Sequence, residues 1–356
     1  MKIAVALSGG VDSATALYLL KQQGWDVFAL FMKNWEEEDE MGTCLSQKDA
    51  EDARCVCELL GVPFYVVNFC KEYWDNVFLH FLNDLKKGRT PNPDILCNRE
   101  IKFKALFDKA KALGADCLAT GHYCQTQKGA LLKGKDSQKD QSYFLYTLKD
   151  TTLKKTLFPI GHLEKSQVRA LAQKAGLPVF NKKDSTGICF IGKRHFRKFL
   201  QTYLPPHPGP IESIEGKKIG THEGLYYYTI GQRSGLSIGG PGEPWFVVAK
   251  DEKTHKLIVA QGENHPALFA PALFATHLSW IKTPPPFPIR CRAKIRYRQK
   301  EQPCLVEVQD NELVAYFDEP QRAITPGQSI VFYENSRCLG GAIIQKALST
   351  KDPQSS

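Results

Sequence analysis

The sequence predicts an α/β protein: a doubly wound parallel sheet followed by a small central β domain and a C-terminal β-barrel. Strand-like apolar runs alternate with helical stretches through the first half of the chain, as βαβ units require. Beyond the proline-rich segment 205–210, short strands and turns replace this pattern. At 356 residues the chain is too long for one core. The predicted parts are residues 1–203, 204–268 and 269–348, with a flexible tail at 349–356.

The first domain begins with a strand, a glycine turn and a helix. Residues 2–7 form an apolar run typical of a buried strand, and residues 12–23 have helical spacing that ends at Gly24. Further strands are predicted at 27–33, 64–69 and 117–123, and helices over 46–60 and 98–113, with Gly61, Gly114 and Gly176 at helix ends. Ligands of such sheets bind at the carboxyl ends of the strands. Ser8, Met32 and Gly121 lie at such ends.

The two β domains are predicted from short strand-like runs between turns. In the central domain these runs are residues 224–240, 244–250 and 256–262. A second proline cluster at 283–288 introduces runs at 304–310, 312–320 and 329–335, which we expect to be strands of a barrel.

The turn after the first strand has the sequence SGGVDS, which favours phosphate binding. Gly9 and Gly10 allow the backbone to approach a ligand closely. The N–H groups at the start of the next helix then face that ligand. Neither G-x-x-x-x-G-K-[ST] nor G-x-G-x-x-G is present at this turn, which argues against a P-loop NTPase and a dinucleotide site. The glycines alone fit close packing equally well.

Composition restricts the class of protein. No run of 18 apolar residues occurs and the chain enters a strand at once, so we expect a cytoplasmic protein with no membrane partner. The eleven cysteines are odd in number and scattered without close pairs other than Cys55 and Cys57, which argues against a secreted disulfide framework. No C-x-x-C pair occurs, which argues against a structural zinc site and an iron–sulfur cluster. The formal charge of +9 suggests an anionic partner.

Two cysteines lie in polar turns. Cys97 follows a proline-rich loop that contains Asp94, and Cys189 lies in the run KKDSTGICFIG. If Asn98 caps the next helix, Cys97 lies just before a helix N-terminus with Arg89 and Arg99 close in sequence, which predicts a lowered pKa and a reactive thiolate. The alternative is that both cysteines are small buried hydrophobic residues, as most free cysteines are.

The run RCRAKIRYRQK at 290–300 places a cation at every second residue. As a strand, it would direct six cations to one face, where they repel one another unless phosphates neutralise them. We therefore expect contact with RNA phosphates here. Tyr297 would lie on the opposite face of this strand and does not fit a simple ladder, which suggests a bend or bulge at that end.

The SGGVDS turn resembles the pyrophosphate-binding loop of the ATP pyrophosphatase superfamily. Seven further strings, together with that loop, resemble the bacterial tRNA-specific 2-thiouridylases in order and spacing, from Ser8 to about Ile344: PNPDILCN, DSTGICFIG, GHY at 121–123, KDQSYFLYTL, TIGQRSGL, RYRQ and TPGQSIVFY. This resemblance implies an ATP pyrophosphatase domain that adenylates the C2 oxygen of the wobble uridine of tRNA. A protein persulfide then supplies sulfur to C2.

The resemblance also assigns residues. It implies ATP binding by Ala6, Leu7, Ser8, Gly9, Gly10, Val11, Asp12, Ser13, Met32 and Gly121, with Asp12 a possible ligand of Mg²⁺. It implies tRNA contacts by Asn92, Pro93, Asp94, His122, Lys139, Asp140, Gln141, Tyr297, Arg298 and Gln328. Cys97 becomes the nucleophile and Cys189 the persulfide carrier, with Asp94 at the uridine in a polar or proton-transfer role.

Two mechanisms and two alternative functions stay open at this point. Either a Cys189 persulfide attacks C2 and Cys97 then attacks the bridging sulfur, or Cys97 releases hydrosulfide that attacks by itself. Both need tRNA and a sulfur-delivering persulfide protein as partners. The rival functions are adenylation of a small molecule, which needs neither thiol, and tRNA binding with a vestigial ATP site.

Overall fold

The computed structural model describes residues 1–36, 45–184, 196–310 and 312–349. Its first part contains a five-stranded sheet in the order β3-β2-β1-β4-β7, with every pairing parallel. The strands are β1 (Lys2–Ala6), β2 (Asp26–Lys33), β3 (Phe64–Asn68), β4 (Cys117–Thr120) and β7 (Thr156–Leu157). The order reverses between β1 and β4, which is where a doubly wound sheet binds its ligand. The predicted fold class is confirmed.

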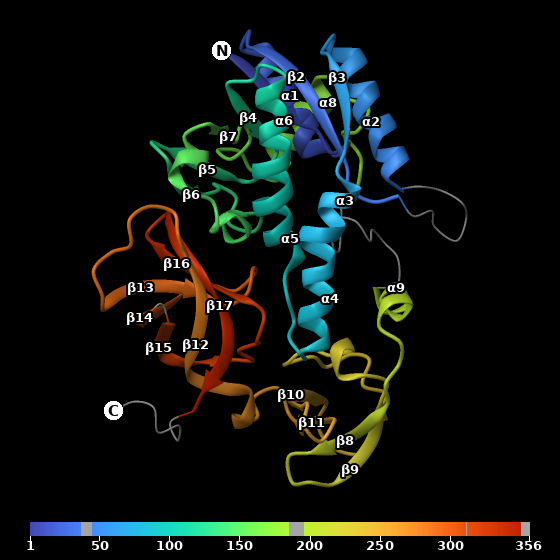
Figure 1. Cartoon of the computed structure of the whole chain (residues 1–356), viewed down its shortest axis with the longest axis vertical. Coiled ribbons are helices and arrows are strands. Elements are labelled where there is room, and N and C mark those ends of the chain that lie inside the picture. The colour runs from blue at the N-terminus through green and yellow to red at the C-terminus, as the bar shows by residue number, and fades with distance from the viewer. Residues whose placement is uncertain (37–44, 185–195, 311, 350–356) are drawn as a thin grey trace.

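Helices cover both faces of this sheet (Figure 1). Ile3 and Val5 of β1 pack toward α1 (Val11–Gln22), α2 (Leu45–Leu60) and α8 (Lys165–Lys174). Ala4 and Ala6 point the other way, because side chains alternate along a strand, and contribute to the core that holds the Cys97 helix. Gly61 follows α2, and Gly114 follows α6 (Leu106–Ala112), with φ of 59° and 86°, as expected for helix ends.

One long rod on this second face contains three helical segments. They are α5 (Pro93–Leu96), a π-helix (Cys97–Ala105) and α6 (Leu106–Ala112). The predicted helix over 98–113 is therefore present, but its first half is wound more widely than an α-helix. The remaining helices of the described residues are α3 (Cys70–Tyr73), a π-helical turn (Trp74–Phe78), α4 (Leu79–Lys86), α7 (Asp150–Leu153) and α9 (Phe196–Tyr203), with 3₁₀ turns at Ser142–Leu145, Leu225–Tyr227 and Pro266–Leu268.

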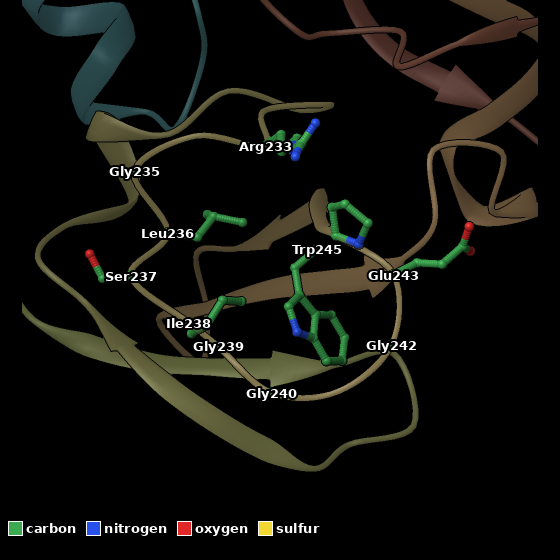
Figure 2. A pocket seen from close by; sticks show the side chains of 11 residues that line it. Arg233, Gly235, Leu236, Ser237, Ile238, Gly239, Gly240, Gly242, Glu243 and Trp245 are labelled. Atoms are coloured by element: carbon green, nitrogen blue, oxygen red, sulfur yellow. The ribbon is translucent and has the colours of Figure 1, made fainter.

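The central domain has a four-stranded sheet in the order β10-β11-β8-β9. Its strands are β8 (Gly209–Ser213), β9 (Lys218–His222), β10 (Trp245–Asp251) and β11 (Lys256–Gln261). The strand-like interpretation of 224–240 is wrong, because this segment holds only a 3₁₀ turn and loops. Gly231 and Gly235 adopt φ of 82° and 78° there, which breaks strand pairing. The loop frames a pocket of about 370 Å³ with the Trp245 ring inside its curve (Figure 2).

The C-terminal domain is a barrel in the order β12-β15-β14-β13-β16-β17, closed by pairing of β12 with β17. Its strands are β12 (Phe269–Trp280), β13 (Ile289–Lys294), β14 (Gln302–Gln309), β15 (Glu312–Arg322), β16 (Ser329–Glu334) and β17 (Arg337–Leu348). β17 also pairs with β6 (Ala130–Lys133), whose hairpin partner is β5 (Cys124–Gln127). The barrel sheet thus continues into the first domain.

Both β domains hold the segment that precedes the Cys97 rod. α4 extends from the first domain toward the central domain (Figure 1). Just after it, Gly88 O accepts a 2.9 Å hydrogen bond from Lys250 Nζ of β10. Thr90 N donates to Pro326 O at 2.8 Å, and Thr90 O accepts from Gln328 Nε2 at 2.6 Å. The position of this segment therefore depends on all three domains.

Lys250 gives this junction a measurable pH dependence. Burial lowers its pKa from 10.5 to about 8, so between these values the unfolded chain binds a proton that the folded chain lacks. The free energy of unfolding of the wild type should therefore rise relative to Lys250→Met, by about 2 kcal/mol, as pH increases from 8 to 10.5. Denaturant titrations across this range measure the difference. Exposed Lys253 is the control position, and a Lys250→Met difference independent of pH would contradict the prediction.

Candidate active site

The SGGVDS turn is held in shape by its own side chains. Ser13 Oγ donates to Gly10 O at 3.1 Å and accepts from Ser8 N at the same distance. Gly9 has φ of 71°, and a Cβ there would lie 2.2 Å from Asp49 O. Only glycine fits this position. The turn leads directly into α1, so the first N–H groups of that helix face the space above it.

The predicted ATP residues from the three strand ends lie around this turn. Gly121 follows β4, and a Cβ there would lie 2.7 Å from Ser13 N. Met32 lies near the end of β2, the strand that pairs with β1. Ala6, Leu7 and Val11 have buried side chains, which leaves their backbone as the part available to a ligand.

An ionic cluster that the sequence analysis missed lies beside the turn. Lys165 Nζ is 2.7 and 2.9 Å from the two carboxylate oxygens of Asp12 and 2.8 Å from Asp184. Asp184 also pairs with Lys139 at 2.7 Å and Arg169 at 2.9 Å. Burial favours a higher pKa for Asp184, but the hydrogen bonds from Lys139 and Lys165 outweigh it and lower the pKa to about 2.

A second lysine also reaches the turn. Lys182 Nζ donates to Gly9 O at 2.9 Å and pairs with Asp49 at 2.8 Å and Asp52 at 2.5 Å. Two ammonium groups, Lys165 and Lys182, therefore lie beside the turn, each paired with two carboxylates in this structure. No sequence motif marks Lys165 and Lys182, because each lies more than 150 residues after the turn that it contacts.

The described residues do not form a metal site around Asp12. Both of its oxygens bind Lys165, and Tyr123 Oη donates to one of them at 2.6 Å. No group of three or more His, Cys, Asp or Glu suited to a metal occurs in the described part of the chain. The Mg²⁺ ligand role predicted for Asp12 stays a prediction, because Lys165 binds both oxygens of this carboxylate in the structure.

Cys97 lies inside the helical rod, and its predicted chemistry is partly wrong. Asn92 Oδ1 accepts a 3.1 Å hydrogen bond from Asp94 N and so caps α5, which makes Cys97 an interior residue. The thiol is 2% exposed, and burial raises its pKa to about 11. The expected lowering by neighbouring arginines does not occur, because Arg89 pairs with Asp84 and Arg99 with Glu100.

The structure describes the residues that precede Cys97 but does not describe Cys189. Asn92, Pro93 and Asp94 share the first turn of α5 with each other and precede Cys97. Cys189 lies outside the described residues. The structure therefore gives no distance between the Cys97 and Cys189 thiols.

His122 is buried, not displayed on the surface. It is 8% exposed and packs against Phe103 and Phe158. Its Nδ1 is 2.8 Å from Thr120 Oγ1, and its Nε2 is 3.5 Å from Lys102 Nζ. Burial lowers its pKa well below the usual range, with help from Lys102. Its contact with tRNA stays a prediction.

The loop 139–141 contacts both the ionic cluster beside the SGGVDS turn and the barrel strand β13. Lys139 binds Asp184, and Gln141 Oε1 accepts from Tyr123 N at 2.9 Å. The Asp140 carboxylate is 4% exposed, accepts from Ser142 Oγ at 3.0 Å and lies 3.4 Å from Lys294. The Asp140 carboxylate is therefore already bound within the protein and has a structural role. The tRNA contacts predicted for this loop stay predictions.

The predicted ladder of six cations is wrong. β13 ends at Lys294 and the chain turns after it, which confirms the bend near Tyr297. Arg290 pairs with Asp318 at 2.5 Å, and Lys294 is buried beside Asp140. Arg296 donates to Ala323 O at 2.7 Å. Protein partners therefore neutralise or engage most of the run, whereas Arg298 is exposed.

The remaining predicted tRNA residues border the barrel. Tyr297 is half-buried against Phe144, with ring centroids 4.3 Å apart, and burial raises its pKa to about 12. Gln328 uses its amide to hold Thr90. These two side chains therefore connect the barrel to the first domain.

Three family models match successive parts of the chain. They are described as the tRNA methyl transferase HUP domain (residues 1–193), the tRNA methyl transferase PRC-barrel domain (197–261) and the aminomethyltransferase beta-barrel domain (271–344).

Comparisons with solved structures cover about half of the chain. NMN synthetase from Francisella tularensis is 21% identical with a TM-score of 0.34, over 51% of this chain and 66% of that one. A complex of a 4-thiouridine synthetase with RNA and ATP is 17% identical with a TM-score of 0.37, over 51% and 42%.

Relatives match over nearly the full length. The tRNA-specific 2-thiouridylase MnmA of Alkaliphilus oremlandii is 55% identical over 355 residues, which is 98% of both chains. That of Francisella philomiragia is 56% identical over 354 residues, 96% of this chain and 99% of the relative. At this identity and coverage, the chain belongs to the tRNA-specific 2-thiouridylase family.

Proposed function

We infer that this protein is a tRNA sulfurtransferase that uses ATP to form 2-thiouridine. The observation that carries this inference is the preorganised SGGVDS turn at the switch point of the sheet, flanked by Lys165 and Lys182, in a chain 55% identical to a 2-thiouridylase along its length. A site for an ATP pyrophosphate needs this combination of free N–H groups and cations. The target, as we propose it, is the uridine at the wobble position.

The proposed reaction has three steps. ATP adenylates the C2 oxygen of the uridine and pyrophosphate leaves, which converts a poor leaving group into AMP. The terminal sulfur of a Cys189 persulfide then attacks C2 and AMP leaves. Finally the Cys97 thiolate attacks the Cys189 sulfur, so the S–S bond to the base breaks, a Cys97–Cys189 disulfide forms, and the base retains the sulfur. Two electrons from an external reductant restore the thiols.

The proposed roles of the residues follow this sequence. ATP lies on Ser8–Ser13 with Met32 and Gly121 beside it, and Mg²⁺ arrives with the ATP phosphates. Asp94 contacts the uridine. The tRNA contacts proposed are Asn92, Pro93, His122, Lys139, Asp140, Gln141, Tyr297, Arg298 and Gln328. A persulfide-carrying protein, such as a cysteine desulfurase or a relay protein, delivers sulfur in the cytoplasm, and no iron–sulfur cluster takes part. No helix in the described ranges is long and apolar enough to cross a membrane.

Labelled sulfur tests the function directly. The protein is incubated with unmodified tRNA, ATP, Mg²⁺, a cysteine desulfurase and ³⁵S-cysteine, and labelled 2-thiouridine and AMP are measured together. We expect label in the tRNA of the wild type and none with Cys189→Ser. AMP formation without label in the tRNA, while the desulfurase is active, would contradict the proposal and favour adenylation of another substrate.

Lys165 provides a prediction specific to ATP. Its ammonium contacts Asp12 in the first turn of α1, so Lys165→Met removes a cation from the proposed phosphate site. The KM for ATP should rise about tenfold, the effect of one lost charge-assisted hydrogen bond. The Kd for tRNA should change less than about twofold. Initial rates and filter binding measure the two quantities, with Lys21→Met in the last turn of α1 as control. An unchanged KM for ATP would exclude this role.

A further inference from the structure

Lys102 lies on the same helical segment as Cys97, five positions further along. In an α-helix the fifth neighbour lies about 140° around the axis. A π-helix closes its hydrogen bonds between fifth neighbours and so brings them to the same side. The wide winding of Cys97–Ala105 therefore turns Lys102 toward the side of the rod that holds the thiol.

His122 fixes the ammonium of Lys102. The Nζ–Nε2 distance is 3.5 Å. An ammonium only donates, so Nε2 accepts and the proton of the neutral ring lies on Nδ1, which donates to Thr120 Oγ1 at 2.8 Å. Burial among Phe103 and Phe158 keeps the ring neutral. His122 thus holds the cation without adding a second positive charge.

Two charged groups act on the Cys97 thiol with opposite signs. Burial is the main influence and raises the pKa of the thiol; Lys102 lowers it and Asp94 raises it further. The nearby Glu100 carboxylate is already bound by Arg99 at 2.7 Å and Lys104 at 2.8 Å. Lys102 is therefore the cation of this segment that acts on the thiol.

We propose that Lys102, held in place by neutral His122, is the counter-ion that stabilises the Cys97 thiolate. Resting on the proposed function, this makes Lys102 a positioning residue for the step in which the thiolate attacks the disulfide sulfur. A buried thiolate without a counter-ion is strongly disfavoured. The Lys102–His122 pair supplies that charge from inside the protein, before any partner binds.

Alkylation of Cys97 tests the proposal on the full-length protein without using thiolation. Wild type, Lys102→Met and Lys102→Arg are treated briefly with iodoacetamide between pH 6.5 and 9.5, and the Cys97 peptide is quantified by mass spectrometry. Iodoacetamide reacts with the thiolate. In Lys102→Met the rate at a given pH should fall about tenfold, as for a profile displaced by about one pH unit. Lys102→Arg should stay within about threefold of the wild type.

Lys104→Met is the matched control, because Lys104 is on the same helix but 67% exposed and bound to Glu100. It should leave the profile unchanged. The proposal is overturned if Lys102→Met reacts at the wild-type rate across this pH range, if Lys104→Met slows the reaction as much as Lys102→Met, or if Lys102→Arg does not restore reactivity. Melting curves verify that the variants are folded.

Single-turnover thiolation separates this proposal from the proposed function. Lys102→Met should slow the appearance of 2-thiouridine about tenfold while the Kd for tRNA and the first burst of AMP are retained. If the wild type fails to thiolate tRNA, the proposed function fails, yet the alkylation result still decides the role of Lys102. Normal single-turnover thiolation by Lys102→Met would overturn the role in sulfur transfer.

Discussion

Cys97→Ser is expected to abolish repeated thiolation of tRNA, with a loss on the order of 10³-fold or more. Serine is a poor nucleophile toward sulfur and cannot form the disulfide that frees the base. Cys97 is also buried within the helical rod that Asn92 caps. The measurement is multiple-turnover formation of 2-thiouridine with labelled sulfur.

The same variant distinguishes the two mechanisms. If the Cys189 persulfide attacks C2 first, Cys97→Ser should release about one AMP per enzyme and accumulate tRNA linked to protein through a reducible bond. If Cys97 must first liberate hydrosulfide, neither AMP burst nor adduct should form. The control is Cys57→Ser, since Cys57 is a residue of α2 that is 1% exposed and packs in the core of the first domain. Repeated thiolation by Cys97→Ser would exclude the proposed nucleophile.

Gly121→Ala is expected to damage both folding and ATP use. The added Cβ would lie 2.7 Å from Ser13 N and 2.8 Å from the carbonyl carbon of Asp12. These are backbone atoms at the start of α1, so the phosphate turn itself must move. We expect a loss of about 1–3 kcal/mol in the free energy of unfolding and a rise of at least about tenfold in the KM for ATP.

Urea titration and initial rates at varied ATP concentration test this prediction. Gly239→Ala is the control, because no atom lies within 4 Å of its Cβ position and its φ is not in the left-handed region. It should leave both quantities near the wild-type values. An unaltered KM for ATP in Gly121→Ala would show that the turn tolerates displacement, against the proposed phosphate site.

Local patterns were sufficient for much of the first domain. The apolar runs predicted strands at 27–33, 64–69 and 117–123, and the structure has strands at Asp26–Lys33, Phe64–Asn68 and Cys117–Thr120. Such runs form buried parallel strands because both faces of the sheet are covered. The segment 224–240 failed by the same criterion, because its aromatic residues belong to a glycine-containing loop.

Charges were predicted less well than strands. The run 290–300 contains six cations, but their partners Asp318, Asp140 and Ala323 O lie on other elements. Likewise, Arg89 and Arg99 were expected to activate Cys97, yet each has a carboxylate partner. The sign of a local field depends on which groups approach in space, whether near or distant in sequence, and residue spacing does not contain that information.

The sequence by itself determined the fold class, the phosphate turn and the identity of the candidate nucleophile, because glycines, strand periodicity and motif strings act over a few residues. Only the tertiary structure decided that Cys97 is buried with a raised pKa, that Lys165 and Lys182 flank the turn, and that Lys102 meets His122. These contacts join residues 20 to more than 150 positions apart. Electrostatic interactions and desolvation depend on distances in space, which the folded chain alone sets.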